Sequence, residues 1–253
     1  MSVLRILVPM AGRGSRFQTA GYTLPKPLID MGGKKMIQVV IENLRPRRDH
    51  QFIFVCQNEH IQENDLRRRL DKWAPGCGVV GIDGITEGAA CTVLLAEEYI
   101  DNGDPLIIAN SDQWVDVSMD TFLSGLDQDP LDGLIMTMKA TDPKWSYVKF
   151  DERGNVTGVI EKVVVSDEAT VGIYYFRFGA EYCRCAHEMI RADDRSKGEF
   201  YVAPVYNYLI RSGRKVGIFN IGSDRDGMYG LGIPEDLEYF LNQPISRKAL
   251  EDQ

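Results

Sequence analysis

Two glycines, an arginine and a lysine near the start of the chain have the types and spacing of a phosphate-binding site. The stretch "VPMAGRGSRF" places Gly12, Gly14 and Arg16 after an apolar run, and a Pro-Lys-Pro triplet centred on Lys26 follows. Glycines after a strand allow main-chain N–H groups to approach an anion closely. Arg16 offers a planar fork of donors, and Lys26 offers a compact charge between stiffening prolines. The pattern predicts a loop that binds several phosphates at once, as in a nucleoside triphosphate.

Two better-known glycine-rich loops do not fit this stretch. The dinucleotide fingerprint G-x-G-x-x-G fails because its third glycine position holds Phe17, and because no strand ends in an acidic residue at the required distance. The P-loop fails because no G-x4-G-K-[ST] spacing is present. A plain glycine turn beside a solvated basic patch is the remaining alternative.

The two motifs "PMAGRGSRF" and "PKPL" together resemble the signature of the nucleotidyltransferases that make nucleotide-sugars and CDP-alcohols. This family includes glucose-1-phosphate thymidylyltransferases and bacterial choline-phosphate cytidylyltransferases. The resemblance extends over nearly the whole chain, although its later motifs are short. It implies a Rossmann-like core and dependence on Mg²⁺. The implied reaction joins an NTP to a phosphorylated acceptor and releases pyrophosphate.

The segment "ITEGAACTV" corresponds to the part of the family that reads the base, with Glu87 as the reading residue. A carboxylate only accepts hydrogen bonds, so Glu87 suits donors of cytosine, uracil, thymine, guanine or adenine and does not choose among them. A structural place near a helix N-terminus is the alternative. The resemblance favours a pyrimidine nucleotide. The nucleotide-binding residues that it implies are Met10, Ala11, Gly12, Gly14, Ser15, Glu87, Gly88, Ala89 and Ser111.

Asp112 follows the apolar run "PLIIAN", and the carboxyl ends of parallel strands are where ligands bind in α/β sheets. Asp112 matches the metal-binding Asp of the family, with Ser111 in place of the usual glycine. The sugar enzymes usually have a second metal-binding Asp in a W-x-D-x-G-T segment, and here Gly230 stands in its place. Asp224 or Asp226 would have to substitute, or one carboxylate would serve together with phosphates and water.

The acceptor side of the site is implied by "VIEKV", in which Glu161 faces hydroxyl groups and Lys162 binds the acceptor phosphate. Gly172 permits close approach, and Glu199 and Tyr201 form a wall. The alternatives are a solvated strand face for the Glu-Lys pair and an ordinary helix entry for the wall. The proposed catalytic residues are Arg16 on the departing pyrophosphate, Lys26, Lys162, and Asp112 through the metal.

Alternating strand and helix patterns must position these residues. They predict an α/β fold, a Rossmann-like three-layer sandwich with a mixed, mainly parallel central sheet. We expect one domain over 1–253, with a nucleotide-binding half at 1–130 and an acceptor-binding half at 131–253. The expected strands are 3–9, 51–57, 77–82, 105–110, 133–140, 146–151, 156–162, 170–178 and 215–221. The expected helices are 36–45, 59–73, 88–99, 180–192, 202–212 and 234–242.

Composition is that of an ordinary globular protein, with 253 residues, 44% hydrophobic residues and a net charge of −8. This charge argues against a nucleic-acid or anionic membrane surface. Five scattered cysteines and three separated histidines indicate neither a disulfide framework nor a zinc site. We expect a cytoplasmic enzyme with no membrane span and no signal peptide. Its oligomeric state stays open, although a homo-oligomer would be in keeping with the resembling enzymes.

Three alternatives remain for the function. The leading expectation is transfer to a sugar 1-phosphate for surface-polysaccharide precursors. The missing Asp at position 230 favours either a cytidylyltransferase acting on a phosphocholine-like, non-sugar phosphate or a non-catalytic nucleotide sensor. A glycosyltransferase is disfavoured, because that class binds a diphosphate through a metal and lacks the loop with Lys26.

Overall fold

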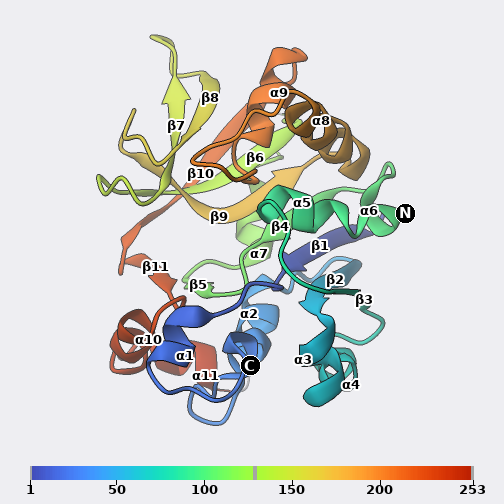
Figure 1. Cartoon of the computed structure of the whole chain (residues 1–253). Helices are drawn as coiled ribbons and strands as arrows, with labels where there is room; N and C mark the ends of the chain where they lie inside the picture. The colour runs from blue at the N-terminus through green and yellow to red at the C-terminus, as the bar shows by residue number, and fades with distance from the viewer. Residues whose placement is uncertain (1, 128–129, 252–253) are drawn as a thin grey trace.

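One continuous sheet forms the centre of the computed structural model, which describes residues 2–127 and 130–251 (Figure 1). The strand order is β3-β2-β1-β4-β9-β6-β10-β11-β5, and β7 pairs with β8 and β9. The predicted boundary near residue 130 adjoins 128–129, which lie outside the described residues. The strands are β1 (Leu4–Pro9), β2 (His50–Gln57), β3 (Gly78–Ile82), β4 (Leu106–Ala109), β5 (Gln113–Val115), β6 (Gly133–Lys139), β7 (Ser146–Phe150), β8 (Val156–Glu161), β9 (Glu168–Phe176), β10 (Val216–Asp224) and β11 (Gly227–Gly230).

All six expected helices are present, although two of them are each divided into two, and the helical segments at 15–19, 26–28, 119–124 and 246–250 are additional to those expected. The expected helix 59–73 is interrupted at Asp65, whose φ of 50° is left-handed and stops helical continuation. The expected helix 88–99 is also two helices. The helices are α1 (Ser15–Thr19), the 3-10 turn η1 (Lys26–Leu28), α2 (Met36–Leu44), α3 (Asn58–Glu63), α4 (Leu66–Trp73), α5 (Ala89–Leu94), α6 (Glu97–Ile100), α7 (Met119–Ser124), α8 (Gly179–Arg191), α9 (Val205–Arg211), α10 (Pro234–Leu241) and α11 (Ser246–Leu250).

The sheet is mixed and mainly parallel along its main path, as predicted. β1, β2, β3 and β4 are mutually parallel, and β6 is parallel to β10. β9 lies antiparallel between β4 and β6 and so joins the two parallel groups. The carboxyl ends of β1 and β4 therefore meet at one edge. Asp112 follows β4 there, and residues 10–16, which are predicted to bind phosphates and are called the phosphate loop below, follow β1.

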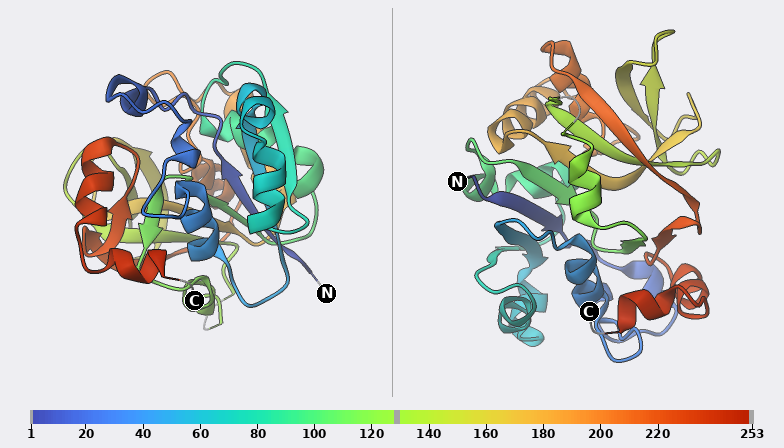
Figure 2. Two further views of the ribbon diagram at one scale, coloured as in Figure 1. Left: turned by 90° about the horizontal axis from the view of Figure 1, so that it is seen from below. Right: turned by 180° about the vertical axis from the view of Figure 1, so that it is seen from behind.

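Helices cover both faces of the sheet and complete a three-layer sandwich. Alternation along β1 places Ile6 and Val8 in one core with α2, α4 and α7, whereas Leu7 lies in the other core with α5, α8 and α9. A third apolar cluster joins α1 and α2 to α10 and α11, which lie side by side in Figures 1 and 2. None of the described helices has the length and apolar character needed to cross a bilayer. All five cysteines are free thiols.

Candidate active site

The phosphate loop, the Pro-Lys-Pro turn and the end of β4 meet at one point. Gly14 has a left-handed φ of 62°, and a Cβ there would lie 3.1 Å from the Cβ of Lys26. The Nζ of Lys26 in turn donates to Oδ2 of Asp112 at 2.7 Å. Both side chains are partly exposed, at 18% for Lys26 and 28% for Asp112. Three motifs that are far apart in the sequence thus form one charged group that is accessible to a ligand.

A side chain from β2 fixes the phosphate loop relative to the segment that precedes Glu87. The amide of Gln57 donates to the carbonyl of Ala11 at 2.5 Å and to that of Gly84 at 2.7 Å. Met10 and Ala11 are buried, whereas Gly12, Ser15 and Arg16 are exposed. The buried start of the loop therefore anchors it, and its exposed part faces outward with the cation of Arg16.

Asp112, the carboxylate expected to hold a metal ion, lies against the backbone that follows Gly230. Gly232 passes so close that a Cβ there would lie 2.8 Å from Oδ2 of Asp112. Gly230 pairs with Gln113, next to Asp112, but brings no side chain. Asp224 instead pairs with Lys144 at 3.6 Å, and the carbonyl of Asp226 accepts from Ser223 within a turn.

No group of three or more potential metal ligands occurs within 2–127 and 130–251. The one accessible carboxylate of Asp112 still fits Mg²⁺, because this ion commonly takes one or two carboxylates and completes its shell with phosphate oxygens and water.

The segment expected to read the base is packed against the backbone near residue 200. Gly88 has a φ of 138°, and a Cβ there would lie 2.4 Å from the carbonyl oxygen of Phe200. The N–H of Phe200 donates to the carbonyl of Glu87 and the N–H of Ala90 donates to the carbonyl of Phe200, both at 2.9 Å. The Glu87 side chain remains 66% exposed and accepts from Arg195 at 3.0 Å. The backbone of this segment is thus fixed while its carboxylate faces solvent.

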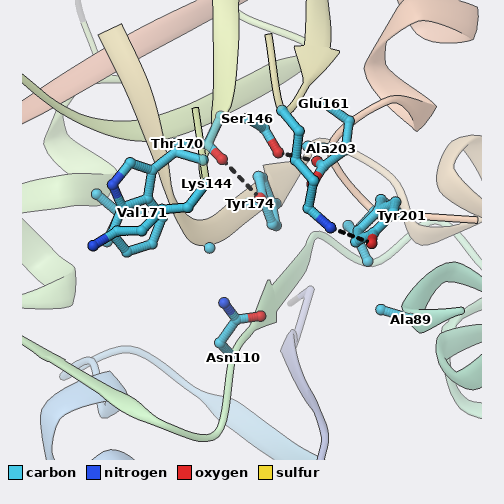
Figure 3. Close-up of a pocket in the computed structure, with 14 residues that line it drawn as sticks. Ala89, Asn110, Lys144, Ser146, Glu161, Thr170, Val171, Tyr174, Tyr201 and Ala203 are labelled. Carbon is cyan, nitrogen blue, oxygen red and sulfur yellow. Dashed lines mark hydrogen bonds between the residues drawn. The ribbon is translucent and has the colours of Figure 1, made fainter. Parts of the chain in front are cut away.

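A cavity of about 300 Å³ adjoins these groups and contains most of the expected acceptor residues (Figure 3). The Nζ of Lys162 donates to the hydroxyl of Tyr201 at 2.7 Å and lies 4.7 Å from the centre of its ring. Glu161 accepts from the hydroxyl of Ser146. The cavity is lined by Ala89, Asn110, Lys144, Trp145, Ser146, Glu161, Lys162, Thr170, Val171, Gly172, Tyr174, Tyr201, Val202 and Ala203.

Gly172 is required by the packing of the cavity floor. It has a φ of 89°, and a Cβ there would lie 2.1 Å from the amide nitrogen of Asn110. The N–H of Asn110 also donates to the carbonyl of Gly172 at 3.0 Å. The carboxamide of Asn110 therefore occupies the space that a side chain at position 172 would fill, and Figure 3 shows it across the cavity from Glu161.

Burial and hydrogen bonding set the charges in this cavity. Burial raises the pKa of Glu161, and the Ser146 hydroxyl opposes this shift by stabilising the carboxylate. The hydrogen bond to Tyr201 raises the pKa of Lys162, which strengthens its hold on a proton. Burial and then a hydrogen bond to Glu199 raise the pKa of Tyr201. Lys162 is therefore a firm cation in the wall. Glu199, which was expected to form part of this wall, bonds to Tyr201 but does not line the cavity.

Comparison with known proteins supports the assignment made from the motifs. The family model described as nucleotidyl transferase matches residues 6–203. The chain belongs to the nucleotidyl transferase family. The fold of this nucleotidyl transferase resembles a nucleoside-diphosphate-sugar pyrophosphorylase from Vibrio cholerae RC9, with a TM-score of 0.79, 25% identity, and coverage of 94% of this chain and 100% of that one.

Curated relatives of the nucleotidyl transferase are longer than the chain itself. A mannose-1-phosphate guanylyltransferase catalytic subunit beta from Danio rerio is 26% identical over 182 residues, which cover 68% of this chain and 49% of the relative. The bifunctional protein GlmU of Thermotoga maritima is 24% identical over 211 residues, with 81% and 44% covered. The chain thus spans about half the length of these relatives. The inositol-1-phosphate CTP transferase of T. maritima shares the fold at 14% identity and a TM-score of 0.72, covering 99% of this chain and 96% of that one.

Several residues of the nucleotidyl transferase site carry no signal that the sequence motifs would reveal. Ser146 and Tyr174 enter the cavity from β7 and β9, Asn110 enters it directly after β4, and Arg195 reaches Glu87 from a loop. Lys144 and Trp145 also line the cavity, and the stretch "DPKWSY" gave a weak sequence signal for them, because it sets a lysine and an aromatic residue in a turn before a strand. The other residues are polar neighbours of apolar strands, and only the packing of the sheet brings them together.

Proposed function

We propose that the chain is a nucleotidyltransferase that joins an NTP to a phosphorylated acceptor with release of pyrophosphate. The supporting observation is the contact between Lys26 and Asp112 beside a cavity whose wall carries Lys162. One cation thus lies beside the phosphate loop, and another lies in the wall of the adjoining cavity. Such an arrangement suits transfer between two phosphates.

The proposed chemistry is an in-line displacement at the α-phosphorus of the NTP. An acceptor phosphate oxygen forms a bond to this phosphorus while the bond to the bridging oxygen of pyrophosphate breaks. The nucleophile is already anionic at neutral pH, so no general base is needed. Arg16 binds the departing pyrophosphate, Lys26 binds the α-phosphate, and Lys162 orients the acceptor, so that catalysis consists of positioning and charge stabilisation.

Mg²⁺ is the proposed metal, with Asp112 as its protein ligand. A divalent ion bound there would neutralise charge on the phosphates. Asp112 would then contact both the metal ion and Lys26, whose ammonium group donates to Oδ2. The pair of Lys26 and Asp112 therefore presents both a fixed cation and a metal ligand to the same phosphates.

A sugar 1-phosphate is the proposed acceptor, because the cavity is rich in groups that bind hydroxyls. Glu161 and Asn110 supply acceptor oxygens, while Ser146, Thr170 and Tyr174 supply hydroxyl groups.

A pyrimidine nucleotide is the proposed donor, on the resemblance to thymidylyl- and cytidylyltransferases. Cytoplasmic supply of surface-polysaccharide precursors is the proposed setting. The two halves, 1–130 and 131–253, are proposed to bind mainly nucleotide and acceptor, respectively, within one domain.

A second candidate is a cytidylyltransferase that uses CTP and a non-sugar, phosphocholine-like phosphate. The glycine at position 230 favours it, because the segment beside Asp112 lacks the second carboxylate of the sugar enzymes. The carboxylate nearest to a Cβ at position 230 is that of Asp236, at 3.4 Å, and it pairs with Arg225 at 3.2 Å. The two candidates differ in the acceptor, and the proposed displacement at the α-phosphorus is the same for both.

The test is a pyrophosphate-release assay with four NTPs against sugar 1-phosphates and phosphocholine, with and without EDTA. We expect release with one NTP and a sugar 1-phosphate, and loss of release with EDTA. Release only with CTP and phosphocholine would support the second candidate. Tight NTP binding with no pyrophosphate under any acceptor would indicate a nucleotide sensor. Release of NDP from an added NDP-sugar, with no pyrophosphate from any NTP, would indicate a glycosyltransferase. Either of these last results would overturn the proposal.

A further inference from the structure

A basic side chain from the proposed acceptor half lies against the base-reading carboxylate. Nη2 of Arg195 donates to Oε2 of Glu87 at 3.0 Å. Nη1 donates to the carbonyl of Gly198 at 3.2 Å, and Nε donates to Asp193. The guanidinium carbon lies 4.2 Å from the centre of the Phe200 ring. These contacts come from different directions, so they fix the plane of the guanidinium.

The loop that carries Arg195 is itself held against the base-reading segment. It turns sharply, with left-handed φ angles of 48° at Asp193 and 49° at Lys197. Its end at Phe200 exchanges backbone hydrogen bonds with Glu87 and Ala90. A surface ion pair alone contributes little to stability, commonly about 0–1 kcal/mol. The backbone hydrogen bonds at Phe200 and the contact of Arg195 with the Phe200 ring restrict the position of Arg195 more than an ion pair with Glu87 alone would.

The pair offers both kinds of hydrogen-bonding group to a base. An arginine has five N–H donors. Three of those of Arg195 are engaged by the described residues, which leaves two for a ligand. Glu87 is 66% exposed and keeps its second oxygen as an acceptor. An acceptor and a charged donor side by side complement a base that carries an N–H or amino group and a ring carbonyl. Guanine, cytosine, uracil and thymine have both groups, and adenine has no carbonyl.

We propose that Arg195 is a specificity-determining residue of the nucleotide site, which holds Glu87 in place and donates to a ring carbonyl of the base. The inference rests on the proposed function, in that Glu87 is taken to face the base. With Arg195 in this role, the site favours NTPs whose base has a ring carbonyl and disfavours ATP. It also means that the nucleotide site takes a residue from both halves of the chain.

The test is calorimetric binding of CTP, GTP, UTP, dTTP, ATP and inorganic tripolyphosphate, each with Mg²⁺ and without acceptor. We expect the wild type to bind at least one oxo-base NTP more tightly than ATP. Arg195→Met should weaken binding of that NTP about tenfold, the loss of one charge-assisted hydrogen bond. Its affinities for ATP and tripolyphosphate should stay unchanged, and Arg195→Lys should retain part of the selectivity. Arg191→Met, on the exposed end of α8, is the matched control.

Two results would overturn the inference: unchanged binding of the preferred NTP by Arg195→Met, or an equal loss for ATP and tripolyphosphate, which would indicate a merely structural role. Glu87→Gln supplies a second check, because the effect of Arg195→Met should shrink in that background if the two residues act together. An undiminished effect there would count against the holding role. These measurements need no turnover, so a failure to release pyrophosphate would refute the proposed function and leave the test of Arg195 intact.

Discussion

At the scale of single residues, the charge on Lys26 is the sharpest test of the chemistry. Its ammonium lies 2.7 Å from Asp112 at a partly buried position, where electrostatic interactions are stronger than in bulk water. We expect Lys26→Ala to lower the turnover number for pyrophosphate release about 100-fold or more, the usual cost of losing one preorganised donor. The fold should survive, because Asp112 is partly exposed and its charge remains solvated.

Lys35→Ala is a suitable control for this change, since Lys35 forms an ion pair with Asp30 at 3.2 Å on the surface. Turnover and unfolding temperature should both be measured for the two variants. Near-normal turnover of Lys26→Ala would contradict the assignment of the phosphate loop. If the unfolding temperature of Lys26→Ala falls so far that the variant is largely unfolded under the assay conditions, the loss of turnover would show that Lys26 serves the fold instead.

Glu161 gives a prediction about pH. Because burial raises its pKa in the folded chain, the folded state favours the protonated carboxyl. The stability it contributes is complete below the ordinary glutamate pKa of about 4.3 and is lost as pH rises through the raised value. Glu161→Gln keeps a neutral group at all pH values. We therefore expect this variant to unfold at a higher temperature than wild type at pH 7, with the difference closing toward pH 4.

The same carboxylate should affect acceptor binding in the opposite direction. An ionised Glu161 accepts hydroxyl hydrogen bonds, so the KM for the acceptor in wild type should fall as pH rises from the glutamate range to neutrality. Glu161→Gln should show a weaker pH dependence of KM, because only the acceptor phosphate, with its second pKa of about 6, still titrates in this range. A wild-type KM that rises with pH, or a variant that is less stable than wild type at pH 7, would argue against a buried carboxylate in this role.

At the scale of elements, the docking of the segment before α5 on the loop around Phe200 depends on one glycine. A Cβ at position 88 would lie 2.4 Å from the carbonyl oxygen and 2.5 Å from the nitrogen of Phe200, and the φ of 138° is unfavourable for any other residue. Backbone atoms cannot move aside as a flexible side chain does. We expect Gly88→Ala to cost about 1–3 kcal/mol in free energy of unfolding and to weaken NTP binding.

The matched control for this substitution is Gly103→Ala, because a Cβ at position 103 meets nothing within 4 Å. Chemical denaturation measures the free energy of unfolding of both variants, and calorimetry measures NTP binding. Equal stability of the two alanine variants would show that the segment shifts easily and that its close approach to Phe200 carries no strain.

Elements with a clear helical period or a continuous apolar run could be predicted from the sequence, and very short ones could not. The fully apolar strand β4 and the amphipathic helix α8 match their expected positions within one or two residues. α1, β5 and β11 are three to five residues long, too short to show a helical or strand period. The break at Asp65 depends on a left-handed backbone that no local composition announces.

At the scale of the whole molecule, some site residues could be predicted from short motifs, whereas others are brought to the site only by the fold. Lys26, Asp112 and Lys162 stood in short motifs, so their types and spacing were readable, and their roles stay predictions. Arg195 and Asn110 contact Glu87 and Gly172, respectively, which are remote from them in sequence. Only the sheet order, with β9 between β4 and β6, brings such segments together.

The third apolar cluster connects the C-terminal helices to the phosphate loop. Phe240 of α10 is fully buried, and its ring centre lies 5.6 Å from that of Trp114 and 5.4 Å from that of Tyr229. Phe17, which follows Arg16, belongs to the same cluster, and Trp114 lies two residues after Asp112. The segment beyond the matched region 6–203 therefore packs under the residues that are predicted to bind phosphate.

Phe240→Ala should therefore affect both stability and ligand binding. We expect a loss of about 3–5 kcal/mol in the free energy of unfolding, as for a large aromatic ring removed from a core. Affinity for inorganic tripolyphosphate should fall as well, because the loop with Arg16 loses its support. Phe178→Ala, at a position that is 37% exposed, should change neither by much. If Phe240→Ala loses stability but binds tripolyphosphate like wild type at a temperature where it is folded, the cluster stabilises the fold without positioning the loop.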